Sequence, residues 1–286
     1  MKAIKAIAHR GEILPSERPP AELLLACSIG EEQLEVHWDP GPLRYPPEME
    51  SEAEIVWRSA CSAASNDTLL FDGPLCALQS YTFENGRLAV SLTQTSYRYV
   101  LFAQYRAEEI VRRWGAEYLP RVLGVSAVVV TTDGALPLMV RSDKVGEFPG
   151  HRDVFGGHIE PKADERGGKP DPFLAIRHEL EEELKLRAQH ISCLRCIGLI
   201  KSLCNQKPEL VFVCHLTQDY RTLLRSATRE PRCSEMETIV RVNDDAGSFV
   251  KFLESWGSTL TPSAYGCLWL YGLQRGFFSL GPGKIH

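Results

Sequence analysis

The chain has 286 residues, of which 44% are hydrophobic and 24% charged, as in an ordinary globular protein of one large or two modest domains. Its formal net charge of −5 disfavours a non-specific nucleic-acid binder, which needs a basic surface. The longest nearly unbroken apolar stretch, Val122 to Val130, is too short to cross a bilayer, and the N-terminus has no apolar signal segment. We therefore expect a cytoplasmic protein without a nucleic-acid or membrane partner.

The first part of the chain has the pattern of a small α+β unit. Alternating apolar and polar residues predict strands, and Asn85-Gly86 predicts a tight hairpin between two of them. Apolar residues on one side of the segment around Ile55 and Val56 predict a helix. The expected strands span residues 22–27, 34–38, 76–83 and 87–94, and the expected helices span residues 50–64 and 105–114.

The composition changes near Leu119–Pro120, where we place a domain boundary. Residues 122–132 are typical of a strand buried on both faces, and Asp133-Gly134 predicts a turn into the next strand. Later strands are expected at residues 136–141, 153–155, 193–202, 209–216 and 237–242, and helices at 172–186, 219–226, 246–256 and from Pro262, capped by Thr261. We thus expect an N-terminal α+β accessory domain over residues 1–118 and a second domain over residues 119–286.

A glutamate-rich segment in the second domain has the composition of a metal site. On a helix, Glu179, Glu182 and Glu183 share one arc beside the apolar face, whereas Glu181 points away. Like charges at this spacing repel, and a hard divalent cation such as magnesium would relieve the repulsion. The alternative is a solvated Glu-rich face. The preceding Gly156-Gly157, expected in a loop, allows close backbone approach and favours a site for magnesium and a diphosphate together.

This segment resembles the Nudix box, Gly-x5-Glu-x7-Arg-Glu-U-x-Glu-Glu-x-Gly-U, where U is aliphatic. Gly157 fits the first glycine, and the second half of the box is matched by Glu179, Leu180, Glu182, Glu183 and Leu186. The sequence departs from the box at His178, where the box has Arg, and at Lys185, where it has Gly. About seven extra residues within 161–172 displace the first box glutamate, whose counterpart is Asp164, Glu165 or neither.

The resemblance extends from about residue 21 through both expected domains, to two-domain Nudix hydrolases that cleave UDP-glucose and UDP-galactose. The matching stretches include residues 23–25, 70–74, 92–98, 123–125, 153–158 and 261–265. The resemblance implies a Nudix fold, an α-β-α sandwich with a mixed central sheet between helices, preceded by the smaller α+β domain. It also implies hydrolysis of a UDP-glucose-like substrate to UMP and sugar 1-phosphate with magnesium, manganese being the alternative ion.

The same resemblance implies roles for single residues. The implied metal ligands are Glu179, Glu182, Glu183 and the backbone carbonyl of Gly156, and the implied catalytic residues are the three glutamates and Glu235. For the glutamate outside the box we favour Glu235 over Glu237, the alternative being an ordinary loop carboxylate. His178 would brace the metal glutamates in place of the box arginine; alternatively Arg177 does so, or His178 faces solvent.

Substrate contacts are expected from both domains. Gly157 and His158 would lie at the phosphates, the alternative for His158 being a loop histidine without a function. Phe71 and Tyr97 would stack on uracil, and Arg98 would pair with phosphate. Core packing is the alternative for the two aromatic residues, since both lie in strand-like sequence. Two other functions stay open at this point: a Nudix diphosphatase for another nucleoside diphosphate such as ADP-ribose, and a Nudix-derived binding module without catalysis.

Overall fold

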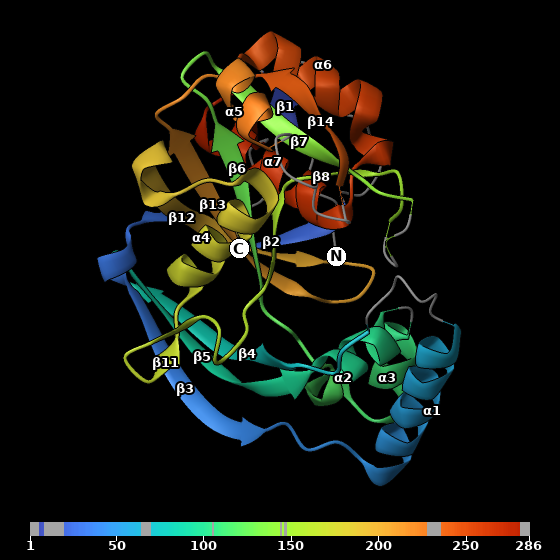
Figure 1. Ribbon diagram of the computed structural model, residues 1–286. Coiled ribbons are helices and arrows are strands. Elements are labelled where there is room, and N and C mark those ends of the chain that lie inside the picture. Colours follow the sequence, from blue (N-terminus) through green and yellow to red (C-terminus); the bar gives the residue numbers. More distant parts are fainter. Residues whose placement is uncertain are drawn as a thin grey trace.

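The computed structural model describes residues 6–8, 20–63, 70–104, 106–143, 145, 148–227 and 236–280. Its centre is a five-stranded mixed sheet with the strand order β2-β12-β13-β6-β9 (Figure 1). The strands are β2 (Ala21–Ile29), β12 (Ile191–Ser202), β13 (Pro208–Leu216), β6 (Gly124–Val130) and β9 (Phe155–His158). β13 and β6 are parallel, and the other neighbours are antiparallel.

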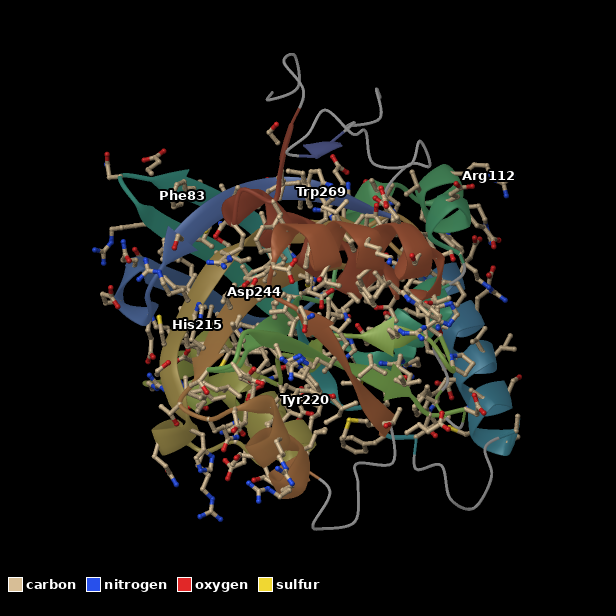
Figure 2. The ribbon with its side chains drawn as sticks, turned by 90° about the horizontal axis from the view of Figure 1, so that it is seen from above. Phe83, Arg112, His215, Tyr220, Asp244 and Trp269 are labelled. Atoms are coloured by element: carbon tan, nitrogen blue, oxygen red, sulfur yellow. The ribbon has the colours of Figure 1, made fainter. Side chains whose placement is uncertain are left out.

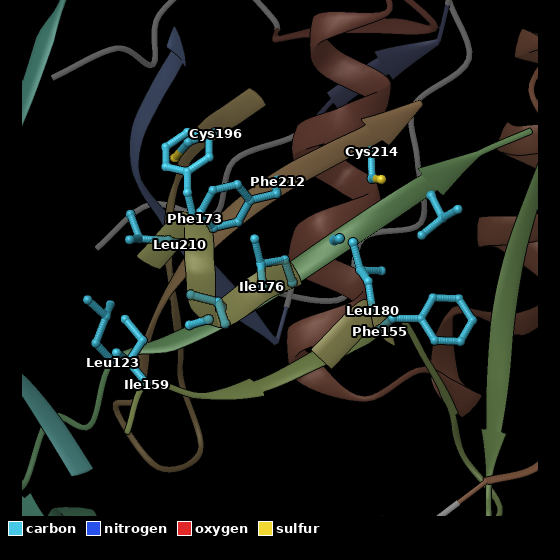
Figure 3. Close-up of a cluster of buried hydrophobic side chains, with 14 of the residues drawn as sticks. Leu123, Phe155, Ile159, Phe173, Ile176, Leu180, Cys196, Leu210, Phe212 and Cys214 are labelled. Carbon is cyan, nitrogen blue, oxygen red and sulfur yellow. The ribbon is translucent and has the colours of Figure 1, made fainter. Parts of the chain in front are cut away.

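One long helix covers each face of this sheet. Along β6 alternate side chains enter two cores: Val125 and Ala127 pack in the core of α4 (Pro172–Leu184), and Val128 packs in the core of α7 (Pro262–Gln274). Figure 3 shows the first core, where the α4 side chains lie against those of β13. The burial of every β6 residue and the mixed sheet between helices confirm the predicted fold class.

A second sheet has the order β14-β7-β8, with β14 (Met236–Asn243), β7 (Ala135–Arg141) and β8 (Arg152–Asp153). The turn predicted at Asp133-Gly134 is present, but β7 pairs with β14 because both edges of β6 are already occupied by β13 and β9. The helices α5 (Tyr220–Ala227) and α6 (Ala246–Trp256) lie beside this sheet. Tyr220, labelled in Figure 2, donates to the carbonyl of Ile239 in β14 at 3.3 Å.

The N-terminal part has a three-stranded sheet in the order β3-β5-β4, with β3 (Leu34–Pro42), β5 (Arg87–Ser96) and β4 (Pro74–Glu84). The predicted hairpin is confirmed: Asn85 and Gly86 have φ of 51° and 73°, as its two-residue turn requires. The predicted helices are confirmed as α1 (Pro47–Ala63) and, in the described residues, α3 (Ala107–Arg113).

The segment after β5 differs from its strand-like pattern, because Tyr97–Ala103 form the helix α2. Ser96 stands at the N-cap position without a side-chain cap. The cap comes instead from Asp72, whose carboxylate accepts from the backbone N–H of Arg98 at 2.8 Å. Since the capping residue lies 26 positions away, the local sequence carries no sign of this helix.

The two parts of the chain share a core and a sheet. Val36, Leu88 and Val90 of the N-terminal sheet belong to the same buried cluster as the apolar face of α4. Backbone bonds also join them: Leu123 donates to the carbonyl of Cys76 at 2.8 Å. β2 is an edge strand of the central sheet, paired with β12. The domain boundary between residues 118 and 119 stays a prediction. β2 precedes this boundary in the sequence, whereas its partner β12 follows it.

The remaining elements are short. β1 (Ala6–Ala8) pairs with β15 (Phe278–Leu280), and β10 (Glu165–Arg166) pairs with β11 (Lys169–Pro170). The 3₁₀ turns are η1 (Glu31–Gln33), η2 (Ala116–Tyr118), η3 (Ala188–His190) and η4 (Gly257–Thr259). Within the described ranges, no helix combines the length and the apolar character needed to span a bilayer.

Candidate active site

The two glycines of the candidate site lie in a strand, which corrects the predicted loop. Gly156 and Gly157 belong to β9 and stand opposite Ser126 and Val125 of β6. A Cβ at Gly156 would overlap the Val125 carbonyl oxygen, so only glycine fits this pairing. Gly156 therefore serves a close approach of two strands, a constraint that a loop prediction does not contain.

Two of the predicted glutamates lie directly against these glycines. Gly156 donates its N–H to Oε2 of Glu183 at 3.0 Å. A Cβ at Gly157 would overlap the Glu179 carboxylate, which occupies that space. Because positions 179 and 183 are one helical turn apart, the two carboxylates lie side by side on the glycine strand. Glu183 is only 7% exposed.

The third glutamate is more exposed and lies near other acidic groups. Burial, together with the charges of Asp164 and Glu182, raises the pKa of Glu160. Acidic side chains thus gather from the end of β9, the following turn and α4. Among the described residues, however, no three His, Cys, Asp or Glu side chains converge as they would on a bound metal ion.

The donor set nevertheless suits a hard divalent cation. Carboxylate and carbonyl oxygens are what magnesium prefers, and Glu179, Glu182 and Glu183 place three of them on one side of α4. Because Gly157 has no side chain, the Glu179 carboxylate lies against the backbone of β9. The metal ligands, including the Gly156 carbonyl, stay predictions; what the structure adds is the bond from the Gly156 N–H to Glu183.

His178 reaches the insertion and not a metal glutamate. Its Nδ1 lies 2.8 Å from Oδ1 of Asp164, a residue that is 4% exposed and also accepts from the Glu160 N–H at 2.8 Å. Asp164 is therefore the acidic partner of the box helix, whereas Glu165 is exposed in β10. Arg177 turns toward Glu31, with a distance of 3.2 Å between Nη2 and Oε2.

His158, predicted to lie at the phosphates, is the last residue of β9. Burial and the positive charge of Lys207 lower the pKa of His158 well below its ordinary value, so its imidazole is neutral at pH 7. Glu235 lies outside the described residues, and Glu237 is exposed on β14. The roles of His158, Glu235 and Glu237 stay predictions.

The predicted base-binding residues lie around the start of α2. Phe71 is 73% exposed, and the ring of Tyr97 meets Trp57 edge-on at 6.3 Å between centroids. Arg98 already pairs with two carboxylates, at 2.7 Å from Glu54 and 3.4 Å from Asp72. A phosphate contact from Arg98 would have to compete with these two ion pairs. Phe71 is not held in this way, because most of its ring is exposed.

Buried charges on the α7 side of the central sheet were not singled out by sequence. Asp153 pairs with Arg141 at 3.2 Å and accepts from the Thr261 hydroxyl, the cap of α7, at 2.7 Å. Glu209, 3% exposed, accepts from the hydroxyls of Ser126 and Ser263. Ser126 is the β6 partner of Gly156, so this cluster adjoins the glycine strand. Glu209 had a sequence signal, because it is the one charged residue near the start of an otherwise apolar strand.

Asp153 predicts a pH dependence of stability. Burial raises its pKa to about 6, against the opposing effect of Arg141. A carboxyl whose folded pKa exceeds its unfolded value stabilises the fold fully below pH 3.8, and this contribution is lost as the pH rises through about 6. The loss amounts to at most about 3 kcal/mol. In urea unfolding at pH 4 to 7, wild type should lose stability relative to Asp153→Asn as the pH rises; parallel pH curves would contradict this.

Lys185 shows how the chain tolerates the missing box glycine. It ends α4 in the left-handed conformation, with φ of 57° and ψ of 31°, and donates its N–H to the carbonyl of Glu181 at 2.9 Å. A side chain with a Cβ is disfavoured there, so Lys185→Gly should stabilise the protein by roughly 0.5–1 kcal/mol. The midpoint of urea unfolding measures this gain, and an unchanged or lower midpoint would count against it.

Comparisons with known proteins support the same family. No family model matches the chain. The mouse uridine diphosphate glucose pyrophosphatase NUDT22 is 30% identical over 303 residues, which cover 94% of this chain and 95% of that protein. The human protein of the same name is 28% identical, covering 90% and 94% of the two chains. Nudix hydrolase 9 of Arabidopsis thaliana is 25% identical, covering 82% and 87%.

Among solved structures, a MutT protein from Methanosarcina mazei aligns with a TM-score of 0.37 and 16% identity, covering 54% of this chain and 95% of that one. The mouse relative matches nearly the full length of both proteins, so the similarity includes the N-terminal part as well as the glutamate helix. Glu183 accepts from the Gly156 N–H, and the Glu179 carboxylate lies against Gly157. The chain therefore belongs to the Nudix hydrolases, and it is a Nudix diphosphatase.

Proposed function

We propose that this enzyme hydrolyses the diphosphate linkage of a UDP-sugar, UDP-glucose or UDP-galactose, to UMP and sugar 1-phosphate with magnesium. The observation that carries the proposal is the extent of the similarity to proteins named uridine diphosphate glucose pyrophosphatase. In the mouse protein the similarity covers 94% of this chain, so it includes the N-terminal sheet as well as the glutamate helix.

The glutamate helix supplies the negative groups that the reaction requires. The ion would be held by Glu179 and Glu183, which lie against β9, and by the neighbouring Glu182. Magnesium bound there would offset the charge of the diphosphate, which otherwise opposes attack by water. The absence of a side chain at Gly157 lets the Glu179 carboxylate approach the backbone of β9. The hydrogen bond from the Gly156 N–H fixes the orientation of the Glu183 carboxylate.

The uracil would be read by the N-terminal part. Phe71 offers an exposed ring face and precedes Asp72, the residue that caps α2, and Tyr97 stands at the start of that helix. Stacking on an aromatic ring binds the face of a planar base and uses none of the hydrogen-bonding groups on its edge. This assignment predicts that Phe71→Ala raises KM for UDP-glucose more than it lowers kcat.

A substrate panel tests the proposal. Purified protein with magnesium is given UDP-glucose, UDP-galactose, ADP-ribose and a CoA ester in separate reactions, and the products are separated by anion-exchange chromatography. We expect UMP from the two UDP-sugars, with kcat/KM well above that for the other two compounds. Inactivity on both UDP-sugars together with hydrolysis of ADP-ribose or the CoA ester would refute the substrate assignment but leave the diphosphatase chemistry standing.

A further inference from the structure

The insertion within the box connects the catalytic helix to the N-terminal part of the chain. Residues 161–171 form a turn followed by the β10–β11 hairpin. Arg166 of this hairpin forms an ion pair with Glu31 of η1. Arg177 of α4 pairs with the other oxygen of the same carboxylate at 3.2 Å. Glu31 therefore bridges two arginines, one in the insertion and one in α4.

The bridge also reaches the N-terminus of α4. Nε of Arg166 lies 3.1 Å from Oδ2 of Asp171. Asp171 is the N-cap of α4, and its other oxygen accepts from the backbone N–H groups of Phe173 at 2.8 Å and Leu174 at 3.2 Å. One carboxylate, Glu31, thus acts on α4 through its cap and through its second turn.

The hairpin is attached to the N-terminal sheet at a second point. Lys169 of β11 donates from Nζ to the carbonyl of Val36 in β3 at 3.3 Å. Between the two attachments, Gly167 and Gly168 have φ of 64° and 81°, and a Cβ at either would meet nothing. The two glycines therefore allow the tight turn at the tip of the hairpin. The hairpin is attached to the N-terminal part by the contacts of Arg166 and Lys169 on either side of this turn.

The charges on α4 give a reason for contacts that hold this helix in place. Glu179, Glu182 and Glu183 repel one another on one side of the helix. The arginine charges lie at its N-terminal half, where they are held by Glu31, whose pKa stays lowered because its bonds to Arg166 and Arg177 outweigh its burial. A single exposed ion pair contributes little, but a carboxylate shared between two elements restrains both.

We propose that Glu31 is a positioning residue: acting through Arg166 and Arg177, it holds α4 on β9 so that Glu179 and Glu183 stay against the glycine strand. The proposal deepens the proposed function and rests on it for its kinetic test. It assigns a task to the insertion, which is to couple the N-terminal part to the helix that carries the chemistry.

The first test compares Glu31→Gln with Glu32→Gln, which removes the same charge from the same turn. Glu31→Gln should lower kcat for UDP-glucose about fivefold, with KM changed less than twofold, because the catalytic carboxylates are displaced and substrate contacts are not. Glu32→Gln should leave kcat unchanged. Thermal unfolding is followed for all three proteins. Equal kcat for the two variants, or a fall in kcat matched by a lost thermal transition, would overturn the proposal.

The second test asks whether Glu31 acts through Arg177. If it does, the double variant Glu31→Gln/Arg177→Gln should be little slower than Glu31→Gln alone, and multiplicative losses would refute the route. Amide hydrogen exchange gives a readout without substrate: Glu31→Gln should speed exchange in residues 172–184 and leave residues 262–274 unchanged. Unchanged exchange in α4 overturns the proposal even if the wild type prefers another nucleoside diphosphate, whereas inactivity of wild type on UDP-glucose bears only on the proposed function.

Discussion

Replacing Glu183 with glutamine should lower the turnover of UDP-glucose on the order of 10²- to 10³-fold and leave the fold intact. Glutamine keeps an oxygen that accepts the Gly156 N–H, so the attachment of α4 to β9 survives. The change removes one negative charge from the carboxylates that would hold magnesium. Turnover is measured as UMP released under saturating substrate, alongside a thermal unfolding curve that reports the fold.

The matched control is Glu181→Gln. Glu181 is exposed and points away from the glycine strand, on the same helix and two positions from Glu183. It should retain wild-type turnover, which would show that the loss in the first variant comes from position and not from the net charge of α4. A Glu183→Gln enzyme as active as wild type would refute the metal role of this residue.

The two adjacent glycines should respond to alanine in different ways. At Gly156 a Cβ would overlap backbone atoms of β6, so Gly156→Ala should destabilise the protein by roughly 3 kcal/mol. At Gly157 a Cβ would overlap only the flexible end of Glu179, which can move away. Gly157→Ala should therefore fold normally and lose turnover, on the order of 10²-fold, because the carboxylate of Glu179, a proposed metal ligand, is displaced.

Urea unfolding and UMP release, measured on both variants, separate stability from activity. Gly247→Ala in α6 is the control, since a Cβ there meets only a carboxylate oxygen of Asp245 at 3.6 Å. It should leave both quantities close to wild type. A Gly157→Ala protein with full turnover would show that the Glu179 position against the strand has no bearing on the reaction.

Much of the fold could be predicted because its signals are local. The apolar spacing of Phe173, Ile176 and Leu180 defines α4, and the apolar run around Val125 to Val130 defines β6. The helix ends at Leu184, two residues before the predicted end, because Lys185 takes the left-handed conformation of a C-cap. The box spacing then brings Glu179 and Glu183 to one side of that helix, where the structure finds them.

The features that sequence reasoning missed depend on contacts between distant positions. The helix α2 is capped by Asp72 from another part of the chain. The pairing of Gly156 with Ser126 decides that the glycines lie in a strand. The partner of Arg177 is Glu31, which lies 146 positions earlier. No local periodicity or motif encodes such pairs, and only the assembled sheet order reveals them.

Phosphorus NMR of UDP-glucose during incubation with the enzyme, once with magnesium and once with excess EDTA, tests the proposed role of the metal most directly. With magnesium we expect the diphosphate signals to disappear and UMP and glucose 1-phosphate to appear in equal amounts. With EDTA the substrate should persist, and adding magnesium in excess should start the reaction. Hydrolysis at the same rate in EDTA would contradict the claim that the α4 glutamates work by holding a divalent cation.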